Sequence, residues 1–286
     1  MGEVKALETI RFSIMTHRGC YGECNFCAIG VHQGRTVQWR SEKSILKEAQ
    51  RLTEFPGFKG YILDVGGPTA NMYGFECQKK LEHGVCTHKR CIFPEICSQL
   101  QPNHQKQIQL LQKLRQIKGI KKIFVASGIR YDLLLHDNQF GKSYLHEIVN
   151  HHVSGQLKVA PEHSEDHVLN LMGKPNFDDL LEFKQLFDKY SAASDRKQFL
   201  TYYLIAAHPG CTEGDMQKLK DQVSRILKMN PEQVQIFTPT PSTYSSLMYY
   251  TEMEPFSRKK IFVEKNVSKK EAQKESLVVK KIYKNR

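Results

Sequence analysis

The 286-residue chain lacks any uninterrupted apolar run of about eighteen residues, the minimum length for a helix that spans a membrane. Its N-terminal segment also lacks a basic stretch followed by an apolar core, which is the pattern of a secretory signal. These two absences argue against a membrane-embedded or secreted protein. We therefore expect a cytoplasmic location and no membrane partner.

The sequence has no fixed-period repeat, and no low-complexity linker precedes its basic C-terminal segment. We expect one core domain over residues 1–255 and a basic C-terminal extension over residues 256–286. Of the net charge of +12, Arg258–Arg286 carries +8, from eleven Lys and Arg against three Glu. A solvated or disordered extension is one interpretation, and contact with RNA is the other.

Six short β-branched and aromatic runs alternate with helical patterns along the chain. The runs are Thr9–Met15, Tyr61–Val65, Lys122–Ala126, Gln156–Ala160, Phe199–Ala207 and Gln233–Phe237. Such alternation predicts parallel strands joined by helices. Six units match a partial barrel better than a complete eightfold one. The predicted fold class is α/β, a partial (β/α)6 TIM-like barrel with a cysteine-rich insertion at about residues 72–103 after the second strand.

Loops rich in glycine, proline and polar residues follow these strands. In strand order they read THRGCYGECNFC, GGPT, SGIRYD, PEHS, HPGC and TPTPST. Chemistry in such barrels sits at the carboxyl ends of the strands. The six loops together therefore predict one rim that holds cofactor and substrate.

Cysteine is abundant, with eight residues, and in a reducing compartment clustered cysteines indicate metal binding or catalysis rather than disulfides. Cys20, Cys24 and Cys27 have the spacing C-x3-C-x2-C. Three thiolates on a four-iron cluster leave one iron open to a small molecule. A zinc site closed by His17 or His32, or inert buried thiols, are the alternatives.

A second group, Cys77, Cys86, Cys91 and Cys97, lies in the insertion with spacings of eight, four and five residues. Four cysteines can close a metal site completely, so a second iron–sulfur cluster and a structural zinc both fit. Unligated or redox-active thiols are the alternative.

Three further residues on the expected rim carry reactive groups. The imidazoles of His163 and His208 can move protons, and the thiol of Cys211 can quench a radical. Loop histidines that only form hydrogen bonds, and an inert thiol, are the alternatives. No catalytic residue is assigned from the sequence.

The cysteine spacing, with Phe26 before the last cysteine, resembles the signature of radical S-adenosylmethionine (SAM) enzymes. The motifs GGPTANMYG, ASGIRYDLLL, KVAPEHSE and AAHPGCTEGDM are most similar to the YgiQ-like radical SAM proteins, over Glu8 to Glu254. This resemblance implies a radical SAM barrel that binds a [4Fe-4S] cluster and SAM. One electron from the cluster would cleave SAM to a 5'-deoxyadenosyl radical, which would take hydrogen from an unknown substrate. The implied electron donor is a reductant such as flavodoxin or ferredoxin.

The resemblance also assigns cofactor-binding positions, and these can be matched one by one. Gly66 and Gly67 would approach the methionine part of SAM, although the usual acid of this motif is replaced near Pro68 and Thr69. The ribose and carboxylate side would be lined by Glu162, Ser164, Ser127 and Arg130.

Two other functions stay open at this point. One is a non-catalytic iron–sulfur or zinc protein that binds RNA through its basic extension. The other, implied by the same resemblance, is modification of tRNA by methylthiolation.

Overall fold

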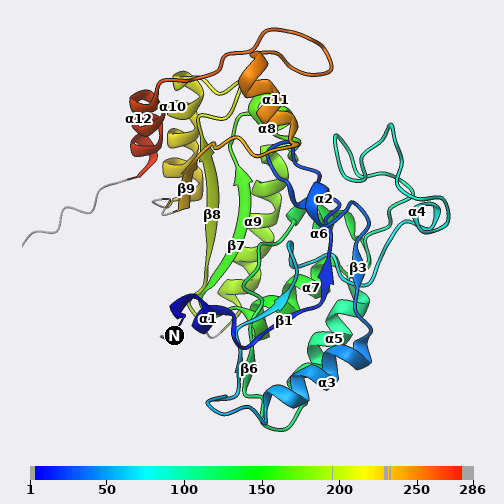
Figure 1. Cartoon of the computed structure of the whole chain (residues 1–286). Helices are drawn as coiled ribbons and strands as arrows, with labels where there is room; N and C mark the ends of the chain where they lie inside the picture. Colours follow the sequence, from blue (N-terminus) through cyan, green and yellow to red (C-terminus); the bar gives the residue numbers. More distant parts are fainter. Residues whose placement is uncertain (1–3, 195, 229–230, 232, 279–286) are drawn as a thin grey trace, which may run out of the picture. The chain divides into compact units, whose positions relative to one another are not determined.

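The computed structural model describes residues 4–194, 196–228, 231 and 233–278 (Figure 1). The chain divides into two compact units. The first comprises residues 1–23, 29–159 and 179–200, and the second comprises residues 24–28, 160–178 and 201–286. Each unit is described by itself.

The first unit is built on short parallel strands. Strand β1 (Ser13–Met15) pairs with β5 (Asp64–Gly66), and β4 (Tyr61–Ile62) pairs with β6 (Lys122–Ile123). The ladder continues through Leu63, whose N–H donates to Phe12 O (2.8 Å). Their inward side chains are aliphatic and fully buried, which gives the unit its core: Ile14, Ile62, Val65 and Ile123.

Helices cover these strands. In α3 (Glu42–Leu52), the Ser41 side chain accepts the Ser44 N–H, and Ile45, Ala49 and Leu52 form the buried face. The described helices of the first unit also include α1 (Lys5–Ile10), α2 (Ile29–His32), α4 (Gln78–His83), α5 (Gln105–Arg115), α6 (Tyr131–His136), α7 (Gly141–Glu147) and the π-helix η1 (Ile148–His152). Helix α9 (Phe177–Ala192) lies mostly in this unit.

A three-stranded sheet has the order β7 (Gln156–Glu162), β8 (Phe199–Ala206), β9 (Gln233–Ile236). Strands β7 and β8 begin in the first unit and end in the second. Strand β8 runs parallel to β9, with Leu204 opposite Val234. The sheet therefore brings the carboxyl ends of all three strands into the second unit.

The second unit also contains α8 (Asp166–Met172), α10 (Glu213–Gln222), the π-helix η2 (Val223–Leu227), α11 (Tyr244–Thr251) and α12 (Val267–Leu277). A capping box starts α10: the Thr212 side chain accepts the Asp215 N–H, and the Asp215 carboxylate accepts the Thr212 N–H.

All six predicted strands are present, but the first begins later than predicted, the second is divided into β4 and β5, and the third ends already at Ile123. Residues Lys5–Ile10 form α1, and the strand begins only at Ser13. The side chains of Leu7 and Ile10 are 52% and 63% exposed, so nothing buries an apolar strand face there. The antiparallel pair β2 (His17–Arg18) and β3 (Gln38–Trp39) was not predicted, because each strand has only two residues.

The basic extension is ordered where the structure describes it. Asn266 caps α12 by accepting the Lys269 N–H, and the helix packs against α10 and β9 with Gln273 and Leu277 buried. This helix is therefore not disordered, because one of its faces is buried against neighbouring elements. Residues 279–286 lie outside the described residues. None of the helices in the described part of the chain has the length and apolar character needed to span a bilayer.

Replacing the Asn266 cap tests whether α12 is a stable helix docked on its neighbours. We expect Asn266→Ala to destabilise α12 by about 1 kcal/mol, so that its amide hydrogens exchange about fivefold faster, while Asn266→Asp retains protection. Hydrogen exchange of the α12 peptides measures this. Equal, unprotected exchange in all three proteins would contradict a docked helix.

Candidate functional site

In the first unit, the backbone around Cys20 is tightly fixed. Gly19 has φ +87°, and a Cβ there would lie 2.5 Å from Thr36 O, so only glycine fits. The Cys20 N–H donates to Gly34 O (3.2 Å), and the Gly22 N–H donates to Cys20 Sγ (3.3 Å). The sulfur thus accepts a backbone hydrogen bond, which favours the thiolate that a metal requires.

The glycine motif lies directly beside this loop. Cys20 Sγ is 3.7 Å from Thr69 Oγ1, and His17 Nε2 is 2.9 Å from Thr69 O. A Cβ on Gly67 would lie 2.6 Å from His17 Nε2, so a side chain there is blocked. The glycine backbone therefore stays bare next to the Cys20 loop.

His17 has both ring nitrogens occupied. Nε2 donates to Thr69 O, because a carbonyl can only accept, and Nδ1 lies 2.9 Å from Thr16 Oγ1. Burial lowers the pKa of His17 to about 4, against the opposing effect of its bond to Thr69. His17 is therefore a neutral structural residue, and this arrangement does not favour the zinc site closed by His17.

Two residues expected at the SAM carboxylate side have partners within the first unit. The Ser127 hydroxyl donates to Asp64 Oδ2, and Asp64 Oδ1 also accepts the Ala126 N–H (2.8 Å). The buried Arg130 guanidinium binds the Asp132 carboxylate through both Nε (2.8 Å) and Nη2 (2.7 Å). Neither Asp64 nor Asp132 was singled out from the sequence. Asp64 is 63 residues from Ser127, whereas Asp132 is only two residues from Arg130, and the sequence does not show that these two side chains turn toward each other.

In the second unit, the loop that carries Cys24 and Cys27 is held through Asn25. The Cys27 N–H donates to Cys24 O (3.0 Å). Asn25 donates its N–H to Met172 O and its side-chain amide to Leu171 O, both at 2.8 Å, and its carbonyl accepts the Ser245 N–H (2.8 Å). The loop is thus fastened to the end of α8 and the start of α11.

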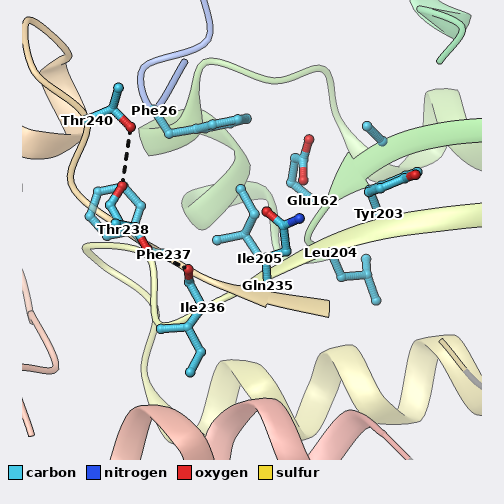
Figure 2. Close-up of a pocket in the computed structure, with 11 residues that line it drawn as sticks. Phe26, Glu162, Tyr203, Leu204, Ile205, Gln235, Ile236, Phe237, Thr238 and Thr240 are labelled. Carbon is cyan, nitrogen blue, oxygen red and sulfur yellow. Dashed lines mark hydrogen bonds between the residues drawn. The ribbon is translucent and has the colours of Figure 1, made fainter. Parts of the chain in front are cut away.

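Phe26, between these two cysteines, lines a pocket of about 330 Å³ (Figure 2). The other lining residues come from the carboxyl halves of β7, β8 and β9 and the loop after β9: Ala160, Glu162, Tyr203, Leu204, Ile205, Gln235, Ile236, Phe237, Thr238 and Thr240. The walls are largely apolar, with a few polar groups. This is the composition of a small-molecule site.

Glu162 and Ser164 have features that suit a polar ligand. Glu162 ends β7 with φ +72°, a conformation that costs a non-glycine residue about 1 kcal/mol, and its carboxylate is 3.8 Å from Lys174 Nζ. Ser164 is buried, and its Oγ has no hydrogen-bond partner among the described residues. A buried hydroxyl without a partner carries a desolvation cost that a bound ligand would relieve.

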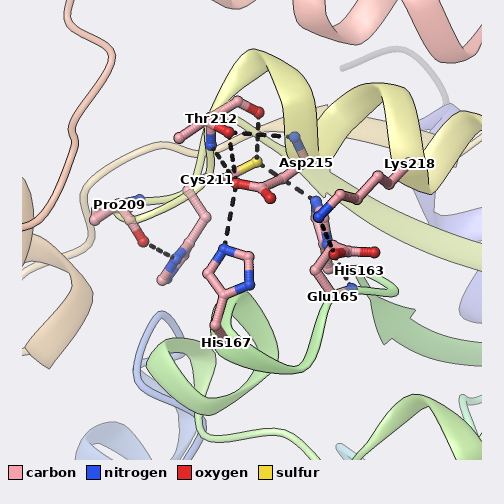
Figure 3. A network of polar contacts seen from close by, with 9 residues as sticks. His163, Glu165, His167, Pro209, Cys211, Thr212, Asp215 and Lys218 are labelled. Carbon is pink, nitrogen blue, oxygen red and sulfur yellow. Dashed lines mark hydrogen bonds and ion pairs between the residues drawn. The ribbon is translucent and has the colours of Figure 1, made fainter.

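His163 and Cys211 form a neutral pair (Figure 3). His163 Nδ1 accepts the Glu165 N–H (3.0 Å), so the proton is on Nε2, which lies 3.4 Å from Cys211 Sγ. Burial lowers the pKa of His163 to about 4 and raises the pKa of Cys211 to about 12. At neutral pH the pair is therefore an imidazole and a thiol, without an ionised nucleophile.

His208 is also held neutral. Its Nδ1 donates to Pro209 O (2.8 Å), and its Nε2 lies 2.7 Å from Ser245 Oγ. Burial lowers the pKa of His208 to about 3. The geometry thus favours the hydrogen-bonding interpretation of both His163 and His208 over proton transfer.

A polar cluster beside this pair was missed from the sequence. One ligand atom each of Glu165, His167 and Asp215 lies within 4.8 Å of the others. Asp215 already caps α10, and Lys218 Nζ pairs with Glu165 (3.0 Å) (Figure 3). These partners account for the cluster as a junction between α8 and α10.

The second cysteine group lies in the first unit. Cys77 is buried directly before α4, and Cys86, Cys91 and Cys97 are half-buried. In the described part of the chain, no three cysteine sulfurs lie within 4.8 Å of one another. Thiolates on a single zinc are about 3.8 Å apart, given a Zn–S distance of about 2.3 Å. The insertion therefore does not hold its cysteines at the spacing of a single-ion site.

Comparison with known proteins gives a family match. The model of the radical SAM superfamily matches residues 14–223. The chain is 59% identical over 281 residues to a UPF0313 protein of Fusobacterium nucleatum, covering 98% of this chain and 50% of that protein. It is 44% identical over 272 residues to a UPF0313 protein of Clostridium perfringens, covering 95% and 41%. The chain thus spans about half or less of the length of these relatives.

Two solved structures share the fold. The radical SAM methyltransferase TsrM from Kitasatospora setae, with cobalamin and a [4Fe-4S] cluster bound, has a TM-score of 0.53 at 15% identity, covering 86% of this chain and 41% of TsrM. The cobalamin-dependent SAM radical enzyme OxsB has a TM-score of 0.53 at 14% identity, covering 82% and 29%. The predicted fold class, an α/β partial TIM-like barrel of radical SAM type, is confirmed.

The close approach of Gly67 to His17 predicts a steric effect. We expect Gly67→Ala to lower the free energy of unfolding by about 2 kcal/mol, because backbone or ring must shift to admit the methyl group. Gly214→Ala is the matched control, since its Cβ would meet nothing closer than 3.6 Å. Anaerobic urea unfolding compares the two, and equal stability of both variants would contradict the contact.

The depressed histidine pKa values predict pH-dependent stability. Unfolded histidines take up protons near pH 6.5, whereas the pKa of folded His163 is about 4, so stability is lost as pH falls between these values. We expect His163→Gln to reduce the loss between pH 7 and pH 5 by about 2 kcal/mol. Urea unfolding at both pH values measures this, and an identical loss in variant and parent would refute it.

Proposed function

The chain belongs to the radical SAM superfamily, and on that premise we propose that it binds a [4Fe-4S] cluster through Cys20, Cys24 and Cys27 and cleaves SAM reductively. The resemblance inferred from the motifs is confirmed at the level of the superfamily. Because the relatives are longer, the activity of a full-length protein is part of this proposal.

The observation that carries the proposal is the position of Phe26. It stands between Cys24 and Cys27, and its ring lines the pocket at the carboxyl ends of β7, β8 and β9. The loop that bears two of the three proposed ligands thus borders a cavity for a small molecule within one unit. In barrel enzymes this end of the strands is where cofactors and substrates bind.

The residues present fit both groups. Cys20, Cys24 and Cys27 are partly exposed, and thiolates are the ligands that iron–sulfur clusters use. The pocket combines apolar walls with the Glu162 carboxylate, and the nearby Ser164 hydroxyl has no partner among the described residues. Together, a bound cluster and SAM would supply one-electron reductive cleavage of the sulfonium.

The chain's own residues would bind and orient these groups. The backbone of Gly66 and Gly67, kept bare beside His17, would accommodate the methionine part of SAM. The Glu162 carboxylate would accept hydrogen bonds from ribose hydroxyls, and Ser164 would gain a partner.

Ser127 and Arg130 would serve the SAM carboxylate only by sharing or exchanging their present partners. The Ser127 hydroxyl donates a hydrogen bond to Asp64, and the Arg130 guanidinium donates to the Asp132 carboxylate. A guanidinium can nevertheless bind a carboxylate through two N–H groups. We therefore propose these two positions as secondary contacts.

A low-potential reductant protein, such as flavodoxin or ferredoxin, is the proposed electron donor, and the cytoplasm is the proposed location because the cysteines must stay reduced. The substrate is not assigned.

The alternative, a non-catalytic metal protein that binds RNA through its basic extension, would hold a metal but leave SAM intact.

The test replaces the three proposed ligands together. We expect Cys20→Ala, Cys24→Ala and Cys27→Ala in one protein to remove the cluster from this site and to lower 5'-deoxyadenosine release at least about 100-fold, because all three proposed thiolate ligands are then lost. Anaerobic reconstitution, dithionite, SAM and chromatography of the products measure this. Cys211→Ala is the control, since Cys211 lies outside the proposed ligand set.

Retention of SAM cleavage by the triple variant, or an iron content equal to that of the parent, would refute the proposal. A parent protein that holds its cluster and never releases 5'-deoxyadenosine would support the non-catalytic alternative instead.

A further inference from the structure

The cysteine-rich insertion is fastened to the loop of Cys20 within the first unit. The Tyr21 hydroxyl donates to Phe75 O, just before the insertion's first cysteine. Arg90, from the insertion, donates to Glu23 O (3.3 Å). These bonds tie the two ends of the Cys20 loop to residues more than fifty positions away in sequence.

Arg35 adds a further link between the same two segments. Its Nε pairs with Glu23 Oε1 (2.5 Å), and its Nη2 donates to the carbonyls of Cys86 (3.1 Å) and Lys89 (3.4 Å). The backbone carrying Cys86 is thereby fixed to the loop carrying Cys20.

A buried ammonium lies beside Cys91. Lys80 Nζ donates to Cys91 Sγ (3.4 Å) and to Arg35 O (2.8 Å), and it pairs with Glu76 (2.9 Å). It also lies 4.7 Å from the centre of the Tyr21 ring. Both side chains of the ion pair are almost fully buried, at 3% and 0% exposure, which is costly unless further polar partners compensate.

Three of the four cysteines share one apolar cluster with Cys20. Cys77 belongs to its buried core, and Cys20, Cys91 and Cys97 pack against it. The core of this cluster also contains Tyr21, Val37, Met72, Phe75, Ile92, Leu100 and Leu133. The second cysteine group therefore adjoins the first proposed ligand across a packed, water-poor region.

We propose that Cys77, Cys86, Cys91 and Cys97 bind a second iron–sulfur cluster. Cys77, Cys91 and Cys97 border one apolar cluster, and the Cys86 carbonyl is held by Arg35, so four cysteines of one insertion supply a complete ligand set. In a cluster each sulfur binds a different iron, so the cluster does not require the compact spacing of a single zinc, which these cysteines lack. The Lys80 hydrogen bond to Cys91 Sγ is of the kind that sets cluster potentials.

A fully ligated cluster has no open iron for SAM, so its role is electron transfer. Its place beside Cys20 suits it to pass one electron from a reduced flavin or iron–sulfur protein to the first centre, with no bond made or broken and no proton moved. The electron-transfer role rests on the proposed function, whereas the proposal that the four cysteines of the insertion bind a cluster does not.

The site is tested by metal content, independently of activity. After anaerobic reconstitution we expect about eight irons and eight sulfides per chain in the parent. We expect about four in a Cys77→Ala, Cys91→Ala protein and about four in the triple variant that lacks Cys20, Cys24 and Cys27. Cys211→Ala should keep about eight. About four irons in the parent, or zinc in the insertion, would overturn the second cluster.

Lys80 supplies a variant that keeps all four cysteines. We expect Lys80→Met combined with Glu76→Gln, which leaves no unpaired buried charge, to retain the iron but to shift the potential of one cluster to a more negative value in an EPR-monitored titration, because the hydrogen bond to Cys91 Sγ is lost. Lys80→Arg alone should largely keep the parent potential. The other cluster should keep its potential. If the reduction potentials of both clusters stayed unchanged, Lys80 would not belong to the second cluster site.

The relay is tested by comparing reductants. We expect the Cys77→Ala, Cys91→Ala protein to lose at least about tenfold more 5'-deoxyadenosine release with reduced flavodoxin than with dithionite, which can reach the first centre directly. Equal losses with both reductants would overturn the relay. If the parent releases none with either reductant, the proposed function fails while the iron count still decides the site.

Discussion

Parallel strand pairing is the constraint on which the rest of the structure depends. Because β1 pairs with β5, and β8 with β9, in the same direction, each pair ends on the same side, and the loops that follow must meet there. In the first unit this places the Cys20 loop against the glycine motif. In the second unit it forms the pocket beside Phe26. The chemistry is local, but strand direction determines which loops become neighbours.

Most of the architecture could be predicted from the sequence, because its signals are local and strong. The β-branched runs mark all six strands, and the Thr212–Asp215 pattern marks the start of α10 through a bond between near neighbours. The first strand was predicted too long, because apolar alternation over Thr9–Met15 does not reveal whether a neighbour exists to bury it. Burial of a short segment is decided by distant residues, which a single sequence does not display.

The candidate site shows the same difference between features that local sequence predicts and features that only the folded chain reveals. Cysteine spacing identified the proposed ligands, yet it gave no sign of the Ser127–Asp64 and Arg130–Asp132 pairs. The Asp64 pair joins residues 63 positions apart, so no local rule predicts it. His163 and His208 were named as candidates, but their neutral state follows from complete burial, which only the folded chain reveals. Residue type can be read from sequence, whereas protonation depends on the surroundings.

The Glu76–Lys80 pair limits how this region can change over evolution. Replacing either residue alone would leave an uncompensated charge in an apolar interior, at a cost of about 3–5 kcal/mol. Viable sequences should therefore retain both charges or lose both together, and Lys80 cannot change without also disturbing Cys91 and the carbonyl of Arg35. Glu76, just before α4, and Lys80, within it, thus make substitutions in the insertion depend on the Tyr21–Arg35 region that the insertion contacts.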